Sequence, residues 1–148
     1  MIKSREIVQK ELEDLRDEFE YLESPMEKME YILDFAKEGD VNENLCGSEV
    51  NKVEGCVTRA YLNISLGSEL EVQFEYFADA LIIRGFFELI KQIVENSRIE
   101  DLKSNLEEIK VFSSHVGLES FLSPNRANAL FNIFEKIEFF AQELHPKE

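Results

Sequence analysis

The sequence is short of cysteines and basic residues and has no long apolar run, and each shortage excludes a class of protein. Two cysteines in 148 residues cannot cross-link a small secreted scaffold, which depends on several disulfides. The 16 Lys and Arg residues face 31 Asp and Glu residues, a net charge of −15. Such a surface repels the phosphates of nucleic acids and of acidic lipids. No segment approaches the ~18 uncharged apolar residues of a membrane span. We therefore expect no nucleic-acid partner and no membrane partner.

The first residues do not resemble a targeting segment. Residues 1–22 carry charges at short intervals, so they lack the apolar stretch of a secretory signal, and they are too acidic for a transit peptide. We therefore expect a cytoplasmic protein, in a reducing compartment where two cysteines are more often reactive or buried than bridged.

The remaining composition is typical of one globular domain. Hydrophobic residues make up 44% and charged residues 32% of the chain, and its length lies near the common domain size. We find no internal repeat and no linker rich in Pro or Gly. The sequence predicts a single domain over residues 1–148, with a core over about 25–143 and an N-terminal helix over about 4–22.

The acidity is concentrated at the start of the chain. Residues 1–50 contain 6 basic and 15 acidic side chains, whereas residues 51–100 and 101–148 each contain 5 and 8. One interpretation is a solvated helix face. The other is a docking surface for a basic patch on a partner.

Apolar spacing predicts helices before and after the middle of the chain. Val8, Leu12, Leu15, Phe19 and Leu22 recur at helical spacing, which predicts a helix over 4–22 capped by Ser4. Ser24-Pro25 opens a second helix that ends at Gly39. We expect its inward residues to be Met29, Ile32, Leu33 and Ala36.

The later helices are predicted by apolarity and caps. Residues 80–95 are too apolar for a surface helix, so we expect a central one, with Gly85 packed closely against the sheet. Residues 105–122 are predicted to be helical in part. Ser123-Pro124 opens a last helix, whose expected core residues are Leu130, Ile133, Phe134 and Ile137.

Two segments alternate as strands do. Residues 57–66 and 69–77 place apolar side chains on one face and polar ones on the other, with Gly67-Ser68 as the turn. This pattern predicts an antiparallel hairpin with one wet face. Because two strands alone are marginal, we expect a third strand around 50–53. The fold class is then α+β: a small antiparallel sheet with helices packed on one face.

Cys56 is the best candidate for chemistry. Residues 40–55 show no periodicity, and a loop of that length is usually functional or disordered. Gly55 permits unusual backbone angles beside the thiol, and Arg59 would favour the thiolate. The alternative interpretation is a small buried hydrophobic residue, since free cysteine is among the most buried types.

The second cysteine and the histidines do not complete a known motif. Cys46 could resolve a disulfide with Cys56 or be incidental, and the spacing is not that of a redox pair. The two cysteines, His115 and His145 lack the spacing of zinc ligands. We therefore expect no metal site, and no cofactor-binding motif is present.

Arg126 and Asp79 stand at helix starts. A cation in a first helical turn costs about 0.3–1 kcal/mol against the helix dipole, so Arg126 should have an acidic partner or serve an anionic site. Asp79 is a plausible mate. The alternatives are a solvated Arg126 and an Asp79 that only caps its helix.

Three segments resemble the SufE family of sulfur-acceptor proteins. Residues 51–62 (NKVEGCVTRAYL) resemble that family's N-x-V-x-G-C-x-S-x-V-W-L segment. Residues 78–85 (ADALIIRG) resemble its S-D-A-x-I-V-K-G, and residues 122–130 (LSPNRANAL) its L-S/T-P-S-R-x-N-G-L. The segments follow in the family's order. Tyr61, Ala78 and Ala129 depart from the family pattern around the active loop, and Cys46 has no place in it, so these differences bear on partner choice.

The resemblance implies a fold and a role. It implies a fold like those of SufE and the scaffold protein IscU, with Cys56 as sulfur acceptor and Asp79 and Arg126 shaping its surroundings. Gly55 and Arg59 are the supporting residues that the local sequence adds. The family takes sulfur from the persulfide of a cysteine desulfurase, a SufS-like pyridoxal-phosphate enzyme that it stimulates, and passes it to an iron–sulfur scaffold. We accordingly expect an accessory sulfur relay with no cofactor of its own.

Two alternative roles differ in how they use the cysteines. A non-catalytic adaptor of the same fold would bind a partner through its acidic helices and leave Cys56 inert. An iron–sulfur scaffold needs about three cysteine ligands and a further group, so two cysteines argue against it. The reactivity of the Cys56 thiol distinguishes the relay from the adaptor.

Overall fold

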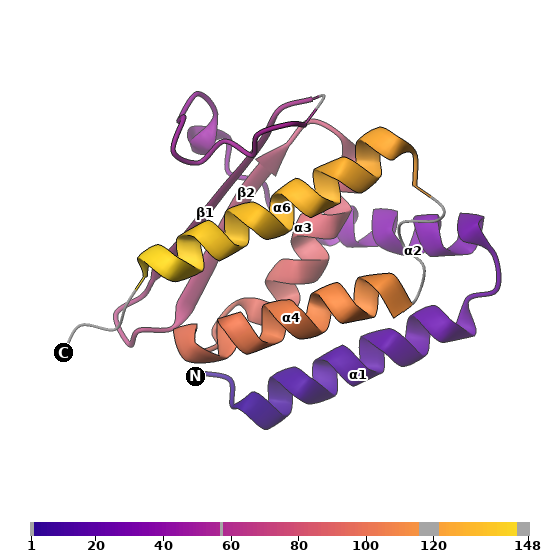
Figure 1. Cartoon of the computed structure of the whole chain (residues 1–148), viewed down its shortest axis with the longest axis horizontal. Coiled ribbons are helices and arrows are strands. Elements are labelled where there is room, and N and C mark those ends of the chain that lie inside the picture. Colours follow the sequence, from indigo (N-terminus) through magenta and orange to yellow (C-terminus); the bar gives the residue numbers. More distant parts are fainter. Residues whose placement is uncertain (1, 57, 116–121, 145–148) are drawn as a thin grey trace.

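The computed structural model describes residues 2–56, 58–115 and 122–144. These residues form five α-helices, one short 3-10 helix and a two-stranded antiparallel sheet (Figure 1). In chain order the elements are α1 (Arg5–Tyr21), α2 (Pro25–Glu38), η1 (Glu43–Leu45), β1 (Ala60–Leu66), β2 (Val72–Ala78), α3 (Leu81–Val94), α4 (Ile99–His115) and α6 (Pro124–Glu143). The predicted α+β class is confirmed. None of the helices in the described ranges combines the length and the apolar character that crossing a membrane requires.

Serine caps begin three of the helices where the sequence predicts them. The hydroxyl oxygens of Ser4, Ser24 and Ser123 each accept a hydrogen bond from the backbone N–H three residues on. Each cap satisfies a backbone donor that has no partner inside the helix. The predicted starts of α1, α2 and α6 are therefore confirmed. Only Ile32 of the four residues predicted to face inward from α2 is fully buried, while Met29 and Leu33 pack partly against the core.

The hairpin buries one of its faces under the helices. β1 pairs with β2 from Ala60↔Ala78 to Leu66↔Val72. The side chains of its buried face are Ala60, Leu62, Ile64, Val72, Phe74, Tyr76 and Ala78, and all belong to the main core. Helices α3 and α6 cover this face (Figure 1). The predicted arrangement, with helices on one face of the sheet, is confirmed.

The expected third strand is reduced to one bridge. Around 50–53, Lys52 forms an isolated bridge with Tyr61, flanked by two backbone bonds, Val53 N–H to Ala60 O at 2.9 Å and Leu62 N–H to Asn51 O at 2.7 Å. The chain turns immediately before and after this contact, so no strand can extend. Both strands also begin later than the alternation predicts, and position 57 lies outside the described residues.

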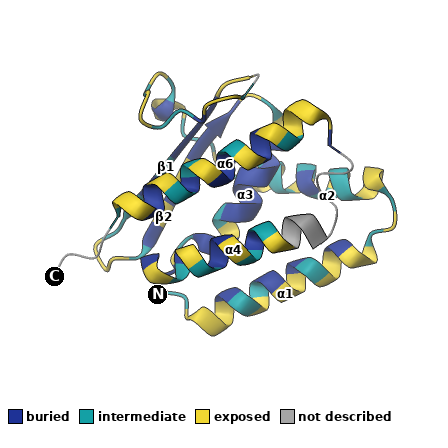
Figure 2. Cartoon of the chain, in the orientation of Figure 1, coloured by how far each residue is buried: buried dark blue, intermediate teal, exposed yellow. Residues whose placement is uncertain are grey.

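Helix α3 is the centre of the molecule. Ten of its 14 residues are buried, and Figure 2 shows it almost entirely in the buried colour. A Cβ atom on Gly85 would lie 2.2 Å from the carbonyl oxygen of Ile32. The close approach predicted at Gly85 is therefore present, but its partner is α2 and not the sheet.

The predicted helical region 105–122 falls largely within α4. That helix continues to His115, which leaves the rest of the prediction, at 116–121, outside the described residues. The following helix, α6, buries all four residues predicted for its core face: Leu130, Ile133, Phe134 and Ile137.

Candidate functional site

The loop between α2 and β1 carries both cysteines along the hairpin. The N–H of Asn42 donates to the carbonyl of Tyr76 at 2.8 Å, which fixes the first part of the loop to β2. Leu45 then packs on Tyr61 and Phe77, on the face of the hairpin that the helices leave open. The second part returns along β1 through the bridge at Lys52. The loop is therefore held to the sheet on both sides of its turn.

Gly55 brings the loop against α6. Its φ is +78°, a conformation that glycine adopts without the steric cost of a Cβ atom. An added Cβ would also lie 2.5 Å from the amide nitrogen of Asn132 on α6. Both the backbone angle and the contact with Asn132 favour glycine at this position, and the chain reaches Cys56 beside α6.

The thiol of Cys56 opens into a cavity of about 450 Å³. Cys56 is half-buried and packs against the main core. The cavity lies between the Cys56 loop and the starts of α3 and α6, and its other lining residues are Thr58, Ala80, Ile83, Ser123, Asn125, Arg126 and Ala129. A nucleophile thus shares a concave site with a cation and three neutral polar side chains.

Arg126 reaches this cavity from the first turn of α6. Within the described residues, no carboxylate lies at ion-pair distance from its guanidinium. The pairing of Arg126 with Asp79 that the sequence suggested is therefore not formed. A cation at a helix start costs free energy against the helix dipole, and no carboxylate of the described residues offsets that cost here.

Asp79 pairs instead with Arg59. The Arg59 Nε–H donates to Asp79 Oδ2 at 2.9 Å, and Nη2–H donates to Oδ1 at 3.0 Å. This hydrogen-bonded pair lowers the pKa of Asp79 and raises the pKa of Arg59. The interpretation of Asp79 as a helix cap is wrong, because Ala80 occupies the N-cap of α3 and no side chain caps that helix.

The hairpin separates the candidate residues into two groups. Cys56 and Arg126 belong to the cavity on the helix-covered side. Arg59 lies over the ring of Phe77, 5.2 Å from its centroid, on the open face. Cys46 packs there too, against the cluster of Leu45, Tyr61 and Phe77. Both cysteines are free thiols, and they pack against different hydrophobic clusters.

The resting electrostatics of Cys56 differ from the expectation. Burial raises the pKa of the Cys56 thiol, whereas the sequence suggested that Arg59 would favour the thiolate. The guanidinium of Arg59 is hydrogen-bonded to Asp79 and does not line the cavity. Desolvation is therefore the effect that shifts the pKa of Cys56. Cys56 is therefore a protonated thiol at neutral pH.

Several cavity residues carry little signal in the sequence. Alternation places Thr58 on the buried face of a strand, and Ser123 is recognisable only as a cap. Asn125 carries no signal, and neither does Asn132, which lies outside the cavity beside Gly55, because a polar residue on a helix is ordinary. In the part of the chain that the structure describes, no group of three His, Cys, Asp or Glu side chains is placed to hold a metal ion.

Comparison with known proteins agrees with this architecture. Residues 13–141 match the SufE family, described as an Fe–S metabolism associated domain. An uncharacterized SufE-like protein of Rhizobium meliloti is 25% identical over 134 residues, which cover 88% of this chain and 94% of the relative. SufE-like protein 1, chloroplastic/mitochondrial, of Arabidopsis thaliana is 24% identical over 92% of this chain but only 36% of its own length.

A solved structure shows the same fold. The solution structure of a hypothetical protein from Thermus thermophilus superposes with a TM-score of 0.71, at 19% identity, over 90% of this chain and 94% of that one. With the family match extending over most of the sequence, the chain belongs to the SufE family, whose domain is associated with Fe–S metabolism.

Proposed function

We propose that this protein accepts sulfur on Cys56 from the persulfide of a cysteine desulfurase and relays it to an iron–sulfur assembly scaffold, stimulating the desulfurase as it does so. The observation that carries the proposal is the shared cavity of Cys56 and Arg126. A thiol that opens into a concave site beside a cation suits the handling of anionic sulfur. Membership in a family associated with Fe–S metabolism supports the same assignment.

The transfer is a thiol–persulfide exchange. The thiolate of Cys56 attacks the terminal sulfur of the donor persulfide, and the sulfur–sulfur bond of the donor breaks. The donor cysteine leaves as a thiolate, and Cys56 becomes the persulfide. The terminal sulfur moves with no external oxidant or reductant, so this chain needs no cofactor for its step. The pyridoxal phosphate belongs to the proposed donor enzyme.

Arg126 and the cavity assist at different stages. Burial keeps Cys56 protonated at rest, and a protonated, half-buried thiol resists over-oxidation. Docking of the donor has to bring the thiol out of this environment, or add positive charge to it, before attack. After transfer the persulfide carries a negative charge, and the guanidinium of Arg126 in the same cavity stabilises it.

Gly55, Arg59 and Asp79 act by positioning in this proposal. Gly55 provides the bend that brings Cys56 to α6. The Arg59–Asp79 pair joins the residue before β1 to the residue after β2, and therefore fixes the end of the loop that carries the thiol. A reducing cytoplasm suits the mechanism because it keeps both thiols free.

The test is sulfur loading in the presence of a purified cysteine desulfurase and L-cysteine. Intact mass should show one added sulfur atom on the wild type, and the desulfurase should turn over faster. Cys56→Ser should accept no sulfur and give no stimulation, because the nucleophile is absent. Cys46→Ser is the matched control and should load normally, since Cys46 packs in a different cluster.

Two results would overturn the relay. Full stimulation of the desulfurase by Cys56→Ser would favour the non-catalytic adaptor. Loss of loading in Cys46→Ser, with a Cys46–Cys56 disulfide in the wild type, would indicate a two-cysteine redox relay instead.

A further inference from the structure

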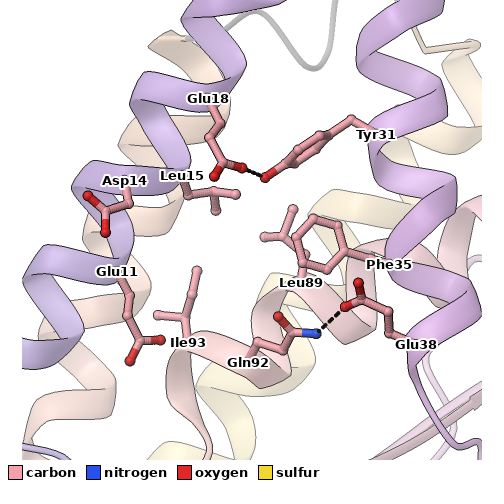
Figure 3. Close-up of a pocket in the computed structure, with 10 residues that line it drawn as sticks. All are labelled: Glu11, Asp14, Leu15, Glu18, Tyr31, Phe35, Glu38, Leu89, Gln92 and Ile93. Atoms are coloured by element: carbon pink, nitrogen blue, oxygen red, sulfur yellow. Dashed lines mark hydrogen bonds between the residues drawn. The ribbon is translucent and has the colours of Figure 1, made fainter.

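A groove lies between α1 and α2 on the surface of α3, away from the thiol cavity. Its volume is about 320 Å³. Figure 3 shows Glu18 of α1 and Tyr31 of α2 meeting across it, where the Tyr31 hydroxyl donates to the Glu18 carboxylate. The floor comes from α3, through Leu89 and Ile93. Three helices therefore form a trough with an apolar base.

The groove continues beyond the Glu18–Tyr31 contact. A second hollow of about 360 Å³ shares these two residues and extends to Asp17, Tyr21 and Leu22. The side chain of Tyr21 is one of the most exposed large hydrophobic groups described, at 86%. The two hollows together make one elongated surface that follows α1, and an exposed aromatic side chain stands at its end.

The rim of this surface is acidic. Five carboxylates line the two hollows: Glu11, Asp14, Asp17, Glu18 and Glu38. No Lys or Arg is among the described lining residues. Two lysines outside the groove form ion pairs with rim carboxylates: Lys3 with Glu11, and Lys10 with Asp14. Two cations against five carboxylates leave the rim with a net negative charge. Five of the 15 acidic side chains of residues 1–50 therefore line an apolar trough.

We propose that this groove is a docking site for an amphipathic helix of a partner protein, with Lys and Arg side chains beside its apolar face. The apolar face would cover Tyr21, Leu22 and Phe35, and the cations would reach the rim carboxylates. Leu89 and Ile93 form the base beneath them and are each 4% exposed. Long basic side chains suit such a rim, because their aliphatic stems pack on apolar surface while the charge stays at the edge.

The occupant is a helix because the walls are helices. α1, α2 and α3 satisfy their own backbone groups, so the groove offers no strand edge to an extended segment. A helix arrives with its backbone already hydrogen-bonded and needs only side-chain complementarity. A second copy of this chain does not fit, since its net charge of −15 repels the rim.

This surface is distinct from the sulfur site. None of its lining residues lines the Cys56 cavity. In Figure 1, α1 lies at the bottom of the molecule and the loop that carries Cys56 lies at the top. The docking site goes beyond the proposed sulfur transfer, and either can fail without the other.

The absence of tryptophan from this chain allows a direct test. The probe is a synthetic amphipathic peptide of Leu and Lys, about four helical turns long, with one Trp on its apolar face. Its fluorescence should shift to the blue and saturate on titration with the protein, and the affinity should fall with added salt. The matched peptide with Glu in place of Lys should not bind.

Variants then locate the site. Asp14→Lys with Asp17→Lys changes two exposed rim positions on α1, and should weaken binding by about tenfold or more, because like charges then face each other. Glu135→Lys with Glu143→Lys makes the same change in net charge at exposed positions of α6 and should leave the affinity within about twofold. Phe35→Ala, with folding checked by circular dichroism, should weaken binding because it removes apolar surface from the α2 wall of the groove.

Backbone NMR shifts on adding the Leu/Lys peptide give the decisive readout. Shifts confined to α1, α2 and α3 along the groove would support the docking site. Equal weakening by the α1 and α6 variants, or shifts centred elsewhere on the surface, would overturn it. Binding of spermine with the same groove shifts and greater affinity than the peptide would also overturn it, in favour of a small-cation site.

Discussion

Arg59 and Asp79 join the two strands at the end where the thiol loop enters the sheet. Two side-chain hydrogen bonds of 2.9 and 3.0 Å link them, and the Asp79 N–H donates to the Arg59 carbonyl at 3.1 Å. Arg59 lies three positions after Cys56 in the chain. The pair therefore holds the C-terminal end of the Cys56 loop, although neither residue lines the cavity.

Asp79→Asn tests this pair through the pH dependence of stability. Arg59 lowers the pKa of Asp79 in the folded protein, so the pair stabilises the fold above the unfolded pKa of ~3.9. This contribution is lost as pH falls through the folded pKa. The wild type should therefore melt slightly higher than Asp79→Asn near neutrality, and the difference should disappear in acid. A difference that persists in acid, or equals that of the exposed control Glu135→Gln, would argue against the pair.

The thiol of Cys56 should titrate above the ordinary range for cysteine. Burial raises its pKa, so alkylation by iodoacetamide should be slow at neutral pH and should accelerate at higher pH than for an unfolded peptide thiol. The Cys46→Ser background isolates the Cys56 signal. The raised pKa also means that the folded state loses stability as pH rises through it. A measured pKa below about 8.5 would show that a cation does act on the resting thiol.

Arg126→Ala should reduce sulfur loading more than it reduces stability. The side chain is exposed, and exposed substitutions usually shift the free energy of unfolding by under about 0.5 kcal/mol. The thermal midpoint should stay nearly unchanged while the rate of sulfur acceptance by Cys56 falls. Arg126→Lys, which retains the charge, should recover part of the rate. If the protein unfolds while the folded fraction loads normally, Arg126 has a structural role instead.

Gly55→Ala separates backbone strain from contact with α6. Gly47 and Gly55 both have positive φ, +86° and +78°, but a Cβ on Gly47 meets nothing within 4 Å. Each alanine should cost about 1–2 kcal/mol of strain, and Gly55→Ala should cost more because of Asn132. Adding Asn132→Ala should recover that excess. Sulfur acceptance should fall in Gly55→Ala and not in Gly47→Ala. An equal fall in Gly47→Ala would show that the contact between Gly55 and α6 is not what sulfur acceptance depends on.

Gly85→Ala should destabilise the protein although it places a better helix former in α3. The propensity gain is about 1 kcal/mol. The new methyl group would lie 2.2 Å from the carbonyl oxygen of Ile32, a backbone atom of α2 that cannot rotate away. Overpacking of this kind costs about 1–3 kcal/mol or more, so we expect a net loss in chemical denaturation. The exposed control Leu81→Ala should lose less, and a gain from Gly85→Ala would contradict the close packing.

Local patterns in the sequence predicted the elements well. Serine followed by an acidic or proline-containing turn defined the starts of α1, α2 and α6, because a cap needs only its own neighbours. Strict alternation defined the hairpin, because a buried face requires it. The prediction of a third strand at 50–53 was wrong, because turns on either side of this segment limit its pairing to one bridge.

Contacts between distant segments could not be predicted in the same way. The sequence suggested Arg126 as the mate of Asp79, whereas the register of the hairpin sets Arg59 beside Asp79 and the two form the pair. Gly85 was correctly expected to pack closely, but its partner on α2 depends on the packing angle of two helices. The cavity combines a loop with the starts of two helices, so its polar residues become visible only in three dimensions.

Helix α3 also fixes the spacing of the two surfaces. Ile83 lines the thiol cavity and Ile93 lines the groove, and ten helical residues correspond to about 15 Å along the axis. Because α3 is buried on nearly all sides, this distance is rigid. A partner tethered in the groove would leave the thiol uncovered for a sulfur donor. If both contacts belonged to one assembly, the tether would raise the effective concentration of the donor at Cys56 without any new contact at the thiol.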